Sequence, residues 1–593
     1  MTAKTFCLLL AIVSLFVSLD SATCGFAEEK PVEKPRIGAV IGEFQLRDYR
    51  GREWSLNDFA DKQILVVAFI GTECPLVKLY AERLKELGEK FAERGVAVVG
   101  INSNQQDSIT EIAHFARVNK IEFPLLKDVG NRVADQFGAQ RTPEVFLLDA
   151  ERRIQYHGAI DDEYHYGVQR AKATETYLYD AIESLLAAKP VKVAETEVIG
   201  CHIGRILEPK NDSPVTYCNQ IARIFQQRCV SCHRKGEIAP FELADYDEVV
   251  GWAEMIEEVV RDQRMPPWTA SPEHGKFKND ATLSAEEKQL IYDWVKNGAP
   301  KGDQKDLPEP VEFVEGWRIG EPDVVIEMSK RPFKVPATGE VPYQYFVVDP
   351  GFKEDKWVKA AECRPGNRAV VHHILVAIPG DRKRARAHGE LNSQWLTAAA
   401  PGAEPLMLPD GYAKLIPAGS KLLFQMHYTP TGTPQEDLSK VGFVFADPET
   451  VKHEVLTQQA VNDGFRIPAG ASNHRVVSSY LFKQDAELLS LFPHMHLRGK
   501  SFQYTAIYPD KSRDILLDVP KYDFNWQIGC QLAEPKQIPA GTRIECVAHF
   551  DNSLDNLANP DPTKAVQWGD QTWEEMMIGY FDIALEGTRD AKK

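Results

Sequence analysis

Along residues 37–200, short apolar runs alternate with segments that carry apolar residues at helical spacing. The run ILVVAFIG at 64–71 has the length of a buried strand, and the amphipathic stretch LVKLYAERLKELGEKFAERG follows it at 76–95. Further strands are expected at 96–102 and 144–149, and further helices near 108–119 and 173–188. This order predicts an α/β domain with right-handed crossovers.

Two different patterns follow, after Pro- and Asp-bearing linkers around 207–217 and 299–313. Residues 217–300 have almost no alternating run and predict an all-α domain. Beyond residue 318, short β-rich runs such as HHILVAI and RIECVAHF are separated by Gly, Pro, Asn and Asp. Their number and spacing predict two all-β, jelly-roll-like sandwiches in series, at 318–450 and 451–593.

Length and charge limit the classes of function. A chain of 593 residues is too long for one hydrophobic core, and its 43% hydrophobic residues are ordinary for globular protein. The net charge of −17 comes from 86 acidic against 69 basic residues, without a stripe rich in Lys and Arg. We therefore expect no nucleic-acid partner.

The N-terminus has the pattern of an export signal. Lys4 precedes the apolar run FCLLLAIVSLFVSL, and small residues ending at Ala27 suit cleavage there, so residues 1–27 are expected to be removed. A lipoprotein anchor at Cys24 is the weaker alternative, because the residues before it lack the expected apolar side chain. No later run is long enough for a membrane helix, so the mature protein is expected outside the cytoplasm, periplasmic or tethered there.

Cys74 falls where an expected strand passes into an expected helix, with Pro75 in the first helical turn. A thiol at that point meets unpaired backbone N–H groups and the positive end of the helix dipole, which favour thiolate. The segment resembles thioredoxin-like redoxins of the alkyl hydroperoxide reductase and thiol-disulfide oxidoreductase group. The resemblance implies that Pro143 in Arg141-Thr142-Pro143 is the cis-proline facing a catalytic Cys74.

This segment departs from the redoxin pattern at two positions. Val77 stands where a C-x-x-C enzyme has its second Cys, and Gly71 replaces the Ser or Thr of the peroxiredoxin pattern. A resolving thiol would have to be remote, and Cys201 in VIGCHIG is the candidate. The alternative is a scaffold kept for docking, with Cys74 in a structural disulfide.

The motif CVSCH at 229–233 has the spacing of covalent heme attachment. Cys229 and Cys232 would form thioethers and His233 would ligate the iron, whereas a redox C-x-x-C is the competing interpretation. Chance predicts about 0.004 such matches in a chain of this composition. The segment resembles class I-like cytochromes c. Met265 in RMPPW is the expected sixth ligand, because two prolines hold the following backbone extended and Trp268 would wall the heme. Met255 is expected in the core instead, and His274 or an open site is the alternative at the sixth position.

Several potential metal ligands lie in the β-rich part, in the order HH, M-H-Y, H-x-H and E-M. Adjacent His residues on a regular strand face opposite ways, so a shared ion at His372 and His373 requires a bulge, whereas His494 and His496 would share one face. The order resembles the copper type II, ascorbate-dependent monooxygenases, the family of peptidylglycine α-hydroxylating and dopamine β-monooxygenases. The resemblance implies two copper ions, one held by His372, His373 and His427 and the other by His494, His496 and Met576. Such ligand sets suit Cu(I)/Cu(II), with zinc as the main alternative.

Departures from that family bear on the substrate. Phe492 stands where peptidylglycine enzymes have a carboxylate-binding arginine, whereas Tyr580 matches a tyrosine that the family uses near its substrate. We therefore expect a less anionic substrate, either a small molecule or a peptide. A cross-strand disulfide between Cys530 and Cys546 is a further expectation. Cys218 and Cys363 have no assigned partner.

The combined expectation is an exported redox enzyme that hydroxylates a C–H bond with O₂. Electrons would come from ascorbate, a redox protein or the tethered cytochrome c segment. The alternative is an electron-transfer or thiol-disulfide redox protein whose copper sandwich is not an oxygenase. A thiol peroxidase that depends on Cys74 is a third hypothesis.

Overall fold

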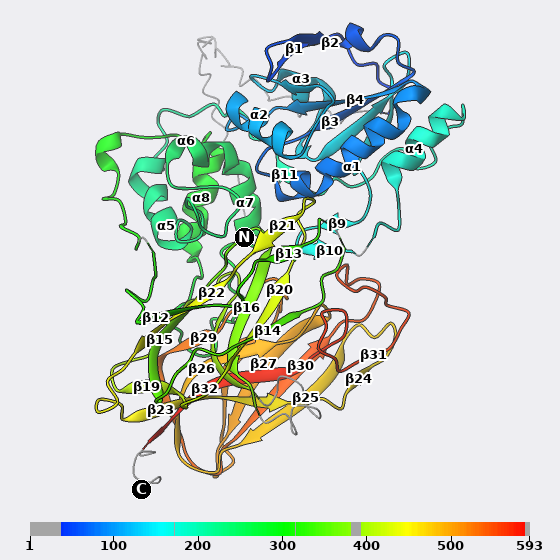
Figure 1. The fold of residues 1–593 in the computed structure, drawn as a ribbon. Helices are drawn as coiled ribbons and strands as arrows, with labels where there is room; N and C mark the ends of the chain where they lie inside the picture. The colour runs from blue at the N-terminus through cyan, green and yellow to red at the C-terminus, as the bar shows by residue number, and fades with distance from the viewer. Residues whose placement is uncertain (1–36, 171, 315, 338, 381–392, 587–593) are drawn as a thin grey trace, which may run out of the picture.

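The computed structural model describes residues 37–170, 172–314, 316–337, 339–380 and 393–586 (Figure 1). The expected export signal at 1–27, with the alternative anchor Cys24, lies outside these residues. Within the described ranges, no helix combines the length and the apolar character needed to cross a membrane.

The N-terminal domain is a thioredoxin-like α/β domain built on a seven-stranded sheet of order β2-β1-β5-β4-β3-β7-β8. Its strands are β1 (Gln45–Asp48), β2 (Glu53–Ser55), β3 (Ile64–Phe69), β4 (Val96–Asn102), β5 (Leu125–Lys127), β7 (Glu144–Leu148) and β8 (Ile154–Gly158). Its helices are α1 (Pro75–Phe91), α2 (Ile109–Val118), α3 (Arg132–Phe137) and α4 (Tyr177–Leu186). Strand β3 is buried along its whole length between two hydrophobic cores, which explains its continuous apolar run.

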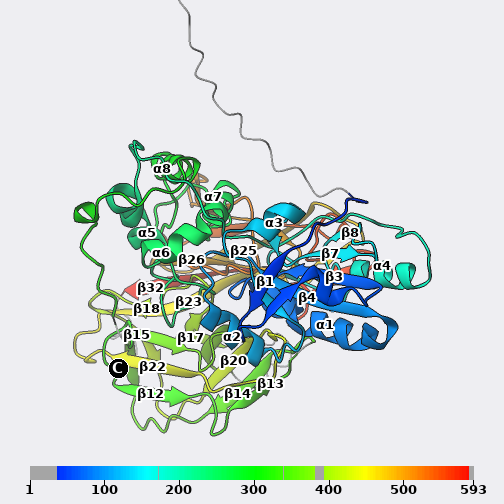
Figure 2. The same ribbon diagram turned by 90° about the horizontal axis from the view of Figure 1, so that it is seen from above.

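The segment that follows is helical. It contains a turn of π-helix (Tyr217–Ile221) and α5 (Ala222–Arg228), α6 (Tyr246–Val249), α7 (Ala253–Arg261) and α8 (Ala285–Lys296). Ser284 and Glu287 form a capping box that starts α8, and the buried Trp294 packs its other end. These helices share one contiguous hydrophobic core with the N-terminal domain, beside which they lie at one end of the β-rich half (Figures 1 and 2).

The β-rich half differs from two independent sandwiches. One nine-stranded sheet, with β18 (Leu406–Met407) off its main path, runs through it in the order β12-β22-β15-β19-β23-β32-β26-β29. A parallel pairing of β19 with β23 joins the two expected halves. The strands are β12 (Val324–Glu327), β15 (Lys356–Arg364), β19 (Tyr412–Ile416), β22 (Lys440–Phe445), β23 (His453–Val461), β26 (Ala486–His494), β29 (Cys530–Ile538) and β32 (Ile578–Glu586).

Two four-stranded sheets accompany this long sheet. The first, of order β14-β20-β16-β17, encloses a core with the N-terminal part of the long sheet, and the second, of order β25-β30-β27-β28, encloses another with the C-terminal part. Their strands are β14 (Gln344–Val348), β16 (Val371–Ile378), β17 (Gln394–Ala399), β20 (Leu422–Tyr428), β25 (His474–Leu481), β27 (Gly499–Ile507), β28 (Arg513–Val519) and β30 (Arg543–Phe550). The long sheet therefore fixes the position of one core relative to the other.

Cys530 and Cys546 lie in different sheets of the second part. Cys530 begins β29 of the long sheet, Cys546 lies on β30 of the facing sheet, and both are free thiols. The expected cross-strand disulfide between them is therefore wrong, because the two strands face each other across the core instead of pairing.

Candidate functional sites

The first histidine group lies on two paired strands. His373 on β16 is opposite His427 on β20, and the register shifts between Val371 and His373. This irregularity is the bulge that the adjacent histidines require. The ring centroids of His372 and His373 lie 4.8 and 5.0 Å from that of His427. One ring nitrogen from each residue lies within 4.8 Å of the others, so the three can hold a single ion.

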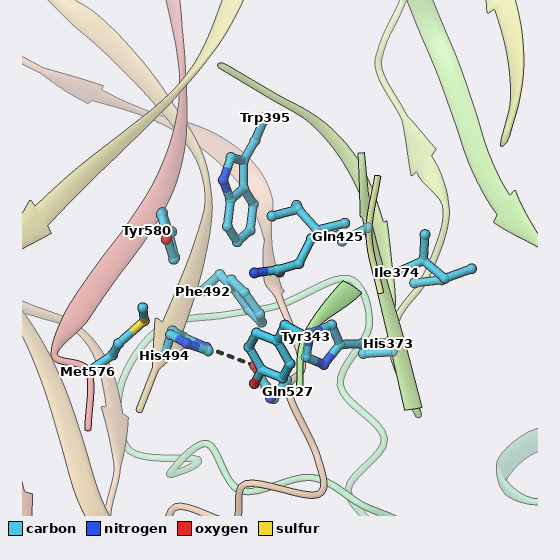
Figure 3. Close-up of a pocket in the computed structure, with 14 residues that line it drawn as sticks. Tyr343, His373, Ile374, Trp395, Gln425, Phe492, His494, Gln527, Met576 and Tyr580 are labelled. Carbon is cyan, nitrogen blue, oxygen red and sulfur yellow. Dashed lines mark hydrogen bonds between the residues drawn. The ribbon is translucent and has the colours of Figure 1, made fainter. Parts of the chain in front are cut away.

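The second group lies where β26 and β32 meet. The expectation that His494 and His496 share one strand is wrong in detail, because β26 ends at His494 and the chain then turns. Their ring centroids nevertheless lie 5.2 Å apart. His494 pairs with Ile578, the second residue after Met576, and Met576 lies beside His494 in the same pocket wall (Figure 3).

The five imidazoles are uncharged at neutral pH. Burial lowers the pKa of His372 and of His494 to about 4. Burial and the neighbouring imidazoles hold the pKa values of the other three rings well below the usual range. An uncharged imidazole is the form that donates a lone pair to a metal.

Hydrogen bonds decide which ring nitrogen is free. His494 Nδ1 donates to Gln527 Oε1 at 2.8 Å, and His496 Nδ1 donates to the Glu574 carbonyl at 3.3 Å. Nε2 of each ring therefore carries the lone pair. Within the described residues, His496 Nε2 and His427 Nδ1 are buried without a hydrogen-bond partner. Buried ring nitrogens left open beside a thioether suit a metal such as copper.

The two groups face one another. The Phe524 ring is stacked on His372 at 5.7 Å between centroids and lies 5.9 Å from His496. His373 and His494 both line a cavity of about 40 Å³ (Figure 3). The other lining residues are Tyr343, Ile374, Leu375, Trp395, Ala398, Ala399, Ala400, Gln425, Phe492, Gln527, Met576 and Tyr580. No lining residue bears an ordinarily charged side chain, and Tyr580 packs on Trp395 with 4.1 Å between ring centroids.

Glu575 and Arg498 support the second group, and neither is among the site residues expected from the sequence. The fully buried Glu575 carboxylate accepts the backbone N–H of His496 at 2.9 Å and of Arg498 at 2.6 Å. Arg498 is 2% exposed and donates to Asn552 Oδ1 at 3.0 Å. Both residues are visible inside the motifs H-M-H-L-R-G and E-E-M-M. Nothing in the sequence shows, however, that their charges are buried.

The CVSCH segment follows α5 directly. The His233 N–H donates to the Cys229 carbonyl at 2.9 Å, which forms one helical turn. His233 Nδ1 donates to the Phe241 carbonyl at 3.1 Å and leaves Nε2 open, as a heme-ligating histidine requires. Burial raises the pKa of Cys229 to about 12 and also raises that of Cys232, so neither thiol is poised as a thiolate.

Met265 lies half-buried beyond the end of α7, and its role as the sixth ligand stays a prediction. Met255 is buried in the core of the helical segment. Trp268 packs against the core of the second sandwich, 5.9 Å from Phe277 between ring centroids, which differs from the expected heme wall. The reason is that residues 270–280 bond to the edge of β29, including a backbone bridge from Phe277 to Leu532.

Cys74 is the N-cap residue of α1 and is fully buried. Its Sγ lies 3.0 Å from the Thr142 carbonyl, next to the cis Thr142-Pro143 bond that the sequence predicts. Burial raises the pKa of the Cys74 thiol. Hydrogen bonds from the Cys201 thiol and from the Val77 and Cys201 backbone outweigh that effect and bring the pKa to about 6. Cys201, remote in sequence, pairs through its backbone with Thr142, whose carbonyl contacts Cys74 Sγ, and so lies beside Cys74.

Comparisons with known proteins agree with this N-terminal geometry. Residues 37–157 match the AhpC/TSA family. Peroxiredoxin Q of Sedum lineare is 31% identical over 157 residues, which cover 25% of this chain and 83% of that protein. The thiol-disulfide oxidoreductase ResA of Bacillus thuringiensis subsp. konkukian is 26% identical over 122 residues, which cover 21% of this chain and 69% of that protein. These relatives support a thiol-based redox function for the N-terminal domain.

Among solved structures, a hypothetical protein from Sinorhizobium meliloti 1021 is 34% identical, with a TM-score of 0.28. The match covers 29% of this chain and 96% of that protein. Through its N-terminal thioredoxin-like redoxin domain, the chain belongs to the AhpC/TSA family.

Proposed function

We propose that the C-terminal half is a copper-dependent monooxygenase that hydroxylates a C–H bond with O₂, and that the helical segment carries heme c. One observation supports the copper proposal above all. The six residues that the sequence singles out by type and order lie as two groups, although they are far apart in the chain, and three of them, His373, His494 and Met576, line one cavity. His372, His373 and His427 would hold one copper ion, and His494, His496 and Met576 the other.

Bound copper supplies one-electron redox chemistry and reaction with molecular oxygen. The chain's own residues set where this happens. Gln527 and the Glu574 carbonyl orient the two imidazoles of the second group, and Glu575 holds the turn that carries His496. Phe492, Trp395 and Tyr580 form an aromatic wall of the cavity that His373 and His494 also line.

The pocket favours a small, uncharged substrate. Its lining contains neutral imidazoles, amides, aromatic rings and aliphatic groups, with no cation to pair with a carboxylate. Phe492 takes the position that an arginine occupies in peptidylglycine enzymes, as the sequence indicates. A volume of about 40 Å³ has room for only a few water-sized groups. A small molecule therefore fits this pocket better than a peptide does.

The helical segment would hold heme c through Cys229, Cys232 and His233, with Met265 as the proposed sixth ligand. Its RMPPW stretch reaches the copper half, because Pro267 and Ile528 both border Gly402. Ile528 follows Gln527, the hydrogen-bond partner of His494. This adjacency supports the cytochrome c segment as electron donor, in place of or together with ascorbate or a redox protein. Export to the periplasm would provide the setting for heme attachment.

A second candidate function is thiol-disulfide redox chemistry without oxygenation. It is favoured by the contact between Cys74 and Cys201 and by the relatives of the N-terminal domain. In that case the histidine groups would bind metal without using O₂, and zinc would be an alternative occupant.

Metal analysis and oxygen uptake on the exported, matured protein distinguish the two functions. The proposal expects two coppers and one heme per chain, with O₂ uptake that depends on a reductant. His494→Ala is expected to lower copper from two to one and to abolish uptake. His549→Ala, at a half-buried ring bonded to Ser501, is the matched control and is expected to keep both. Absence of copper, or uptake unchanged in His494→Ala, would sink the oxygenase proposal.

A further inference from the structure

The peptide that follows the N-terminal domain returns to cover its reactive thiol. The short strand β11 (Cys201–His202) pairs antiparallel with β6 (Arg141–Thr142), so that Cys201 lies opposite Thr142 and His202 opposite Arg141. Thr142 is also the residue whose carbonyl lies 3.0 Å from Cys74 Sγ. The pairing therefore places Cys201 beside Cys74 through a backbone ladder.

The backbone before Cys201 is held on three sides. The Gly200 carbonyl accepts from Tyr166 Oη at 2.7 Å and from Arg141 Nη1 at 2.8 Å. A Cβ atom at Gly200 would lie 2.1 Å from the Thr142 carbonyl oxygen, so only glycine allows this close approach. Glycine at position 200, directly before Cys201, thus allows the backbone of Cys201 to lie close to the cis-proline loop.

The next residue ties the same strand to the helical segment. Glu258 on α7 accepts from His202 Nε2 at 2.7 Å and from Arg141 Nη2 at 2.5 Å, and it also pairs with Arg264. The cluster joins β11, β6 and α7. Strand β11 is consequently held between two domains, and Cys201 is held with it.

Resting on the thiol-disulfide function proposed above for the N-terminal domain, we propose that Cys74 and Cys201 form a reversible intramolecular disulfide, and that Cys201 is the sulfur that exchanges with an outside low-molecular-weight thiol or disulfide. Cys201 supplies the second thiol, which the C-P-L-V sequence lacks because Val77 occupies the position of the second cysteine in a C-x-x-C motif. Exposure assigns the order, because Cys74 is 0% exposed and Cys201 is 8% exposed. An outside reagent therefore meets Cys201 first.

The exchange balances in both directions. An outside thiolate attacks the Cys201 sulfur of the disulfide, the bond to Cys74 breaks, and Cys74 leaves as a thiolate. A second outside thiol attacks the mixed disulfide and releases the Cys201 thiol with one outside disulfide. Two electrons and two protons pass from the outside thiols to the protein. The hydrogen bonds that stabilise the Cys74 thiolate make it a good leaving group.

The test uses the full-length matured protein in mixtures of glutathione and glutathione disulfide. After alkylation and tryptic digestion, mass spectrometry is expected to find residues 63–78 linked to residues 193–205. The oxidised protein is expected to have two fewer reactive thiols than the reduced protein. Cys363→Ser, at a buried thiol in the first sandwich, is the matched control and is expected to give the same linkage.

Three variants test the geometry. Cys201→Ser is expected to lose the linked peptide and to leave Cys74 reduced or slowly glutathionylated. Gly200→Ala keeps both sulfurs but is expected to shift the equilibrium toward the dithiol at least tenfold. Glu258→Gln is expected to shift the equilibrium toward the dithiol as well, but by a smaller factor than Gly200→Ala. Failure to find the 63–78 to 193–205 linkage in folded wild-type protein under any glutathione ratio overturns the proposal, as does linkage of Cys74 to a different cysteine. Neither result bears on copper binding.

Discussion

Replacing Glu575 by Ala should release the turn that carries His496. The carboxylate is fully buried and accepts the backbone N–H groups of His496, Arg498 and Met576, at 2.9, 2.6 and 3.3 Å. Its Oε1 also lies 3.9 Å from Arg498 Nη1. One side chain therefore connects two proposed copper ligands and compensates a buried cation.

The loss of stability follows from these contacts. Each buried N–H left without an acceptor costs about 1–3 kcal/mol. A buried cation deprived of its partner costs about 3–5 kcal/mol. Arg498 keeps its bonds to Asn552 Oδ1 and the Trp573 carbonyl, both at 3.0 Å, which lowers that cost. The three N–H groups and the reduced cost at Arg498 together give a loss of at least about 4–6 kcal/mol. At about 2–4 °C per kcal/mol, that loss lowers the melting temperature of this part by at least roughly 8–24 °C.

The neighbouring glutamate provides a matched control. Glu574 is half-buried and its carboxylate accepts the backbone N–H of Gln571, while its bond to His496 comes from the backbone and survives substitution. Calorimetry and copper analysis should show a large loss of melting temperature and of bound copper for Glu575→Ala. The loss should be intermediate for Glu575→Gln and small for Glu574→Ala. Equal melting temperatures and copper contents for Glu575→Ala and Glu574→Ala would refute the reasoning, since the buried contacts would then carry no stability.

Three further changes test other parts of the molecule. Hydrogen bonds and charge from arginine and histidine partners outweigh the effect of burial and lower the pKa of Glu258 from 4.5 to about 2. Ionised Glu258 therefore stabilises the folded protein by about 2 kcal/mol after allowance for solvent screening. This contribution is complete above pH 4.5 and is lost as the pH falls toward 2. The melting temperatures of Glu258→Gln and of wild type should converge over that range. Tyr428→Phe removes a buried hydrogen bond of 2.9 Å to Asp437 and should cost about 1–3 kcal/mol by urea unfolding, and an unchanged midpoint would contradict this. His233→Ala should leave heme attached but shift its absorption spectrum, whereas Met255→Leu should not; identical spectra would argue against His233 as ligand.

The N-terminal domain was the most predictable part of the chain. Each strand and helix expected between 64 and 188 is present, because the apolar runs and amphipathic stretches there follow local periodicity. The position of Cys74 at a helix start also followed from local context, whereas the cis bond at Pro143 was implied by the resemblance to redoxins. Local pattern decides the strands, the helices and the position of Cys74, and these features need no knowledge of distant contacts.

The β-rich half shows where sequence reasoning reached its limit. Its strands were visible as short runs, but the continuous sheet depends on a parallel pairing between Tyr412 and His453 that no local pattern reveals. The same limit applies to Cys530 and Cys546, whose strands look like hairpin partners but belong to facing sheets. Strand pairing is set by long-range contacts, so alternation predicts the strands without predicting their neighbours.

The candidate metal ligands could be identified from the sequence, whereas the residues that contact and orient them could not. Imidazole and thioether are uncommon enough that His372, His427 and Met576 stand out by type and order. Gln527 and Phe524 have common side chains, and they are recognisable as supports only because the fold brings them against the imidazoles.

The order of the modules along the chain explains why three redox elements would occupy one polypeptide. Strand β11 runs from the end of the N-terminal domain past Cys74 and bonds through His202 to α7. The segment after α7 then runs past Pro267, which borders Gly402 together with Ile528, to the edge of β29. Ile528 follows Gln527, the hydrogen-bond partner of His494. Each connecting segment is thus also part of a contact between sites. These two segments offer one route for coupling between the proposed disulfide and the proposed copper sites. A variant such as Glu258→Gln that loosens the first segment should leave copper binding intact while weakening the effect of copper on the thiol–disulfide equilibrium of Cys74 and Cys201.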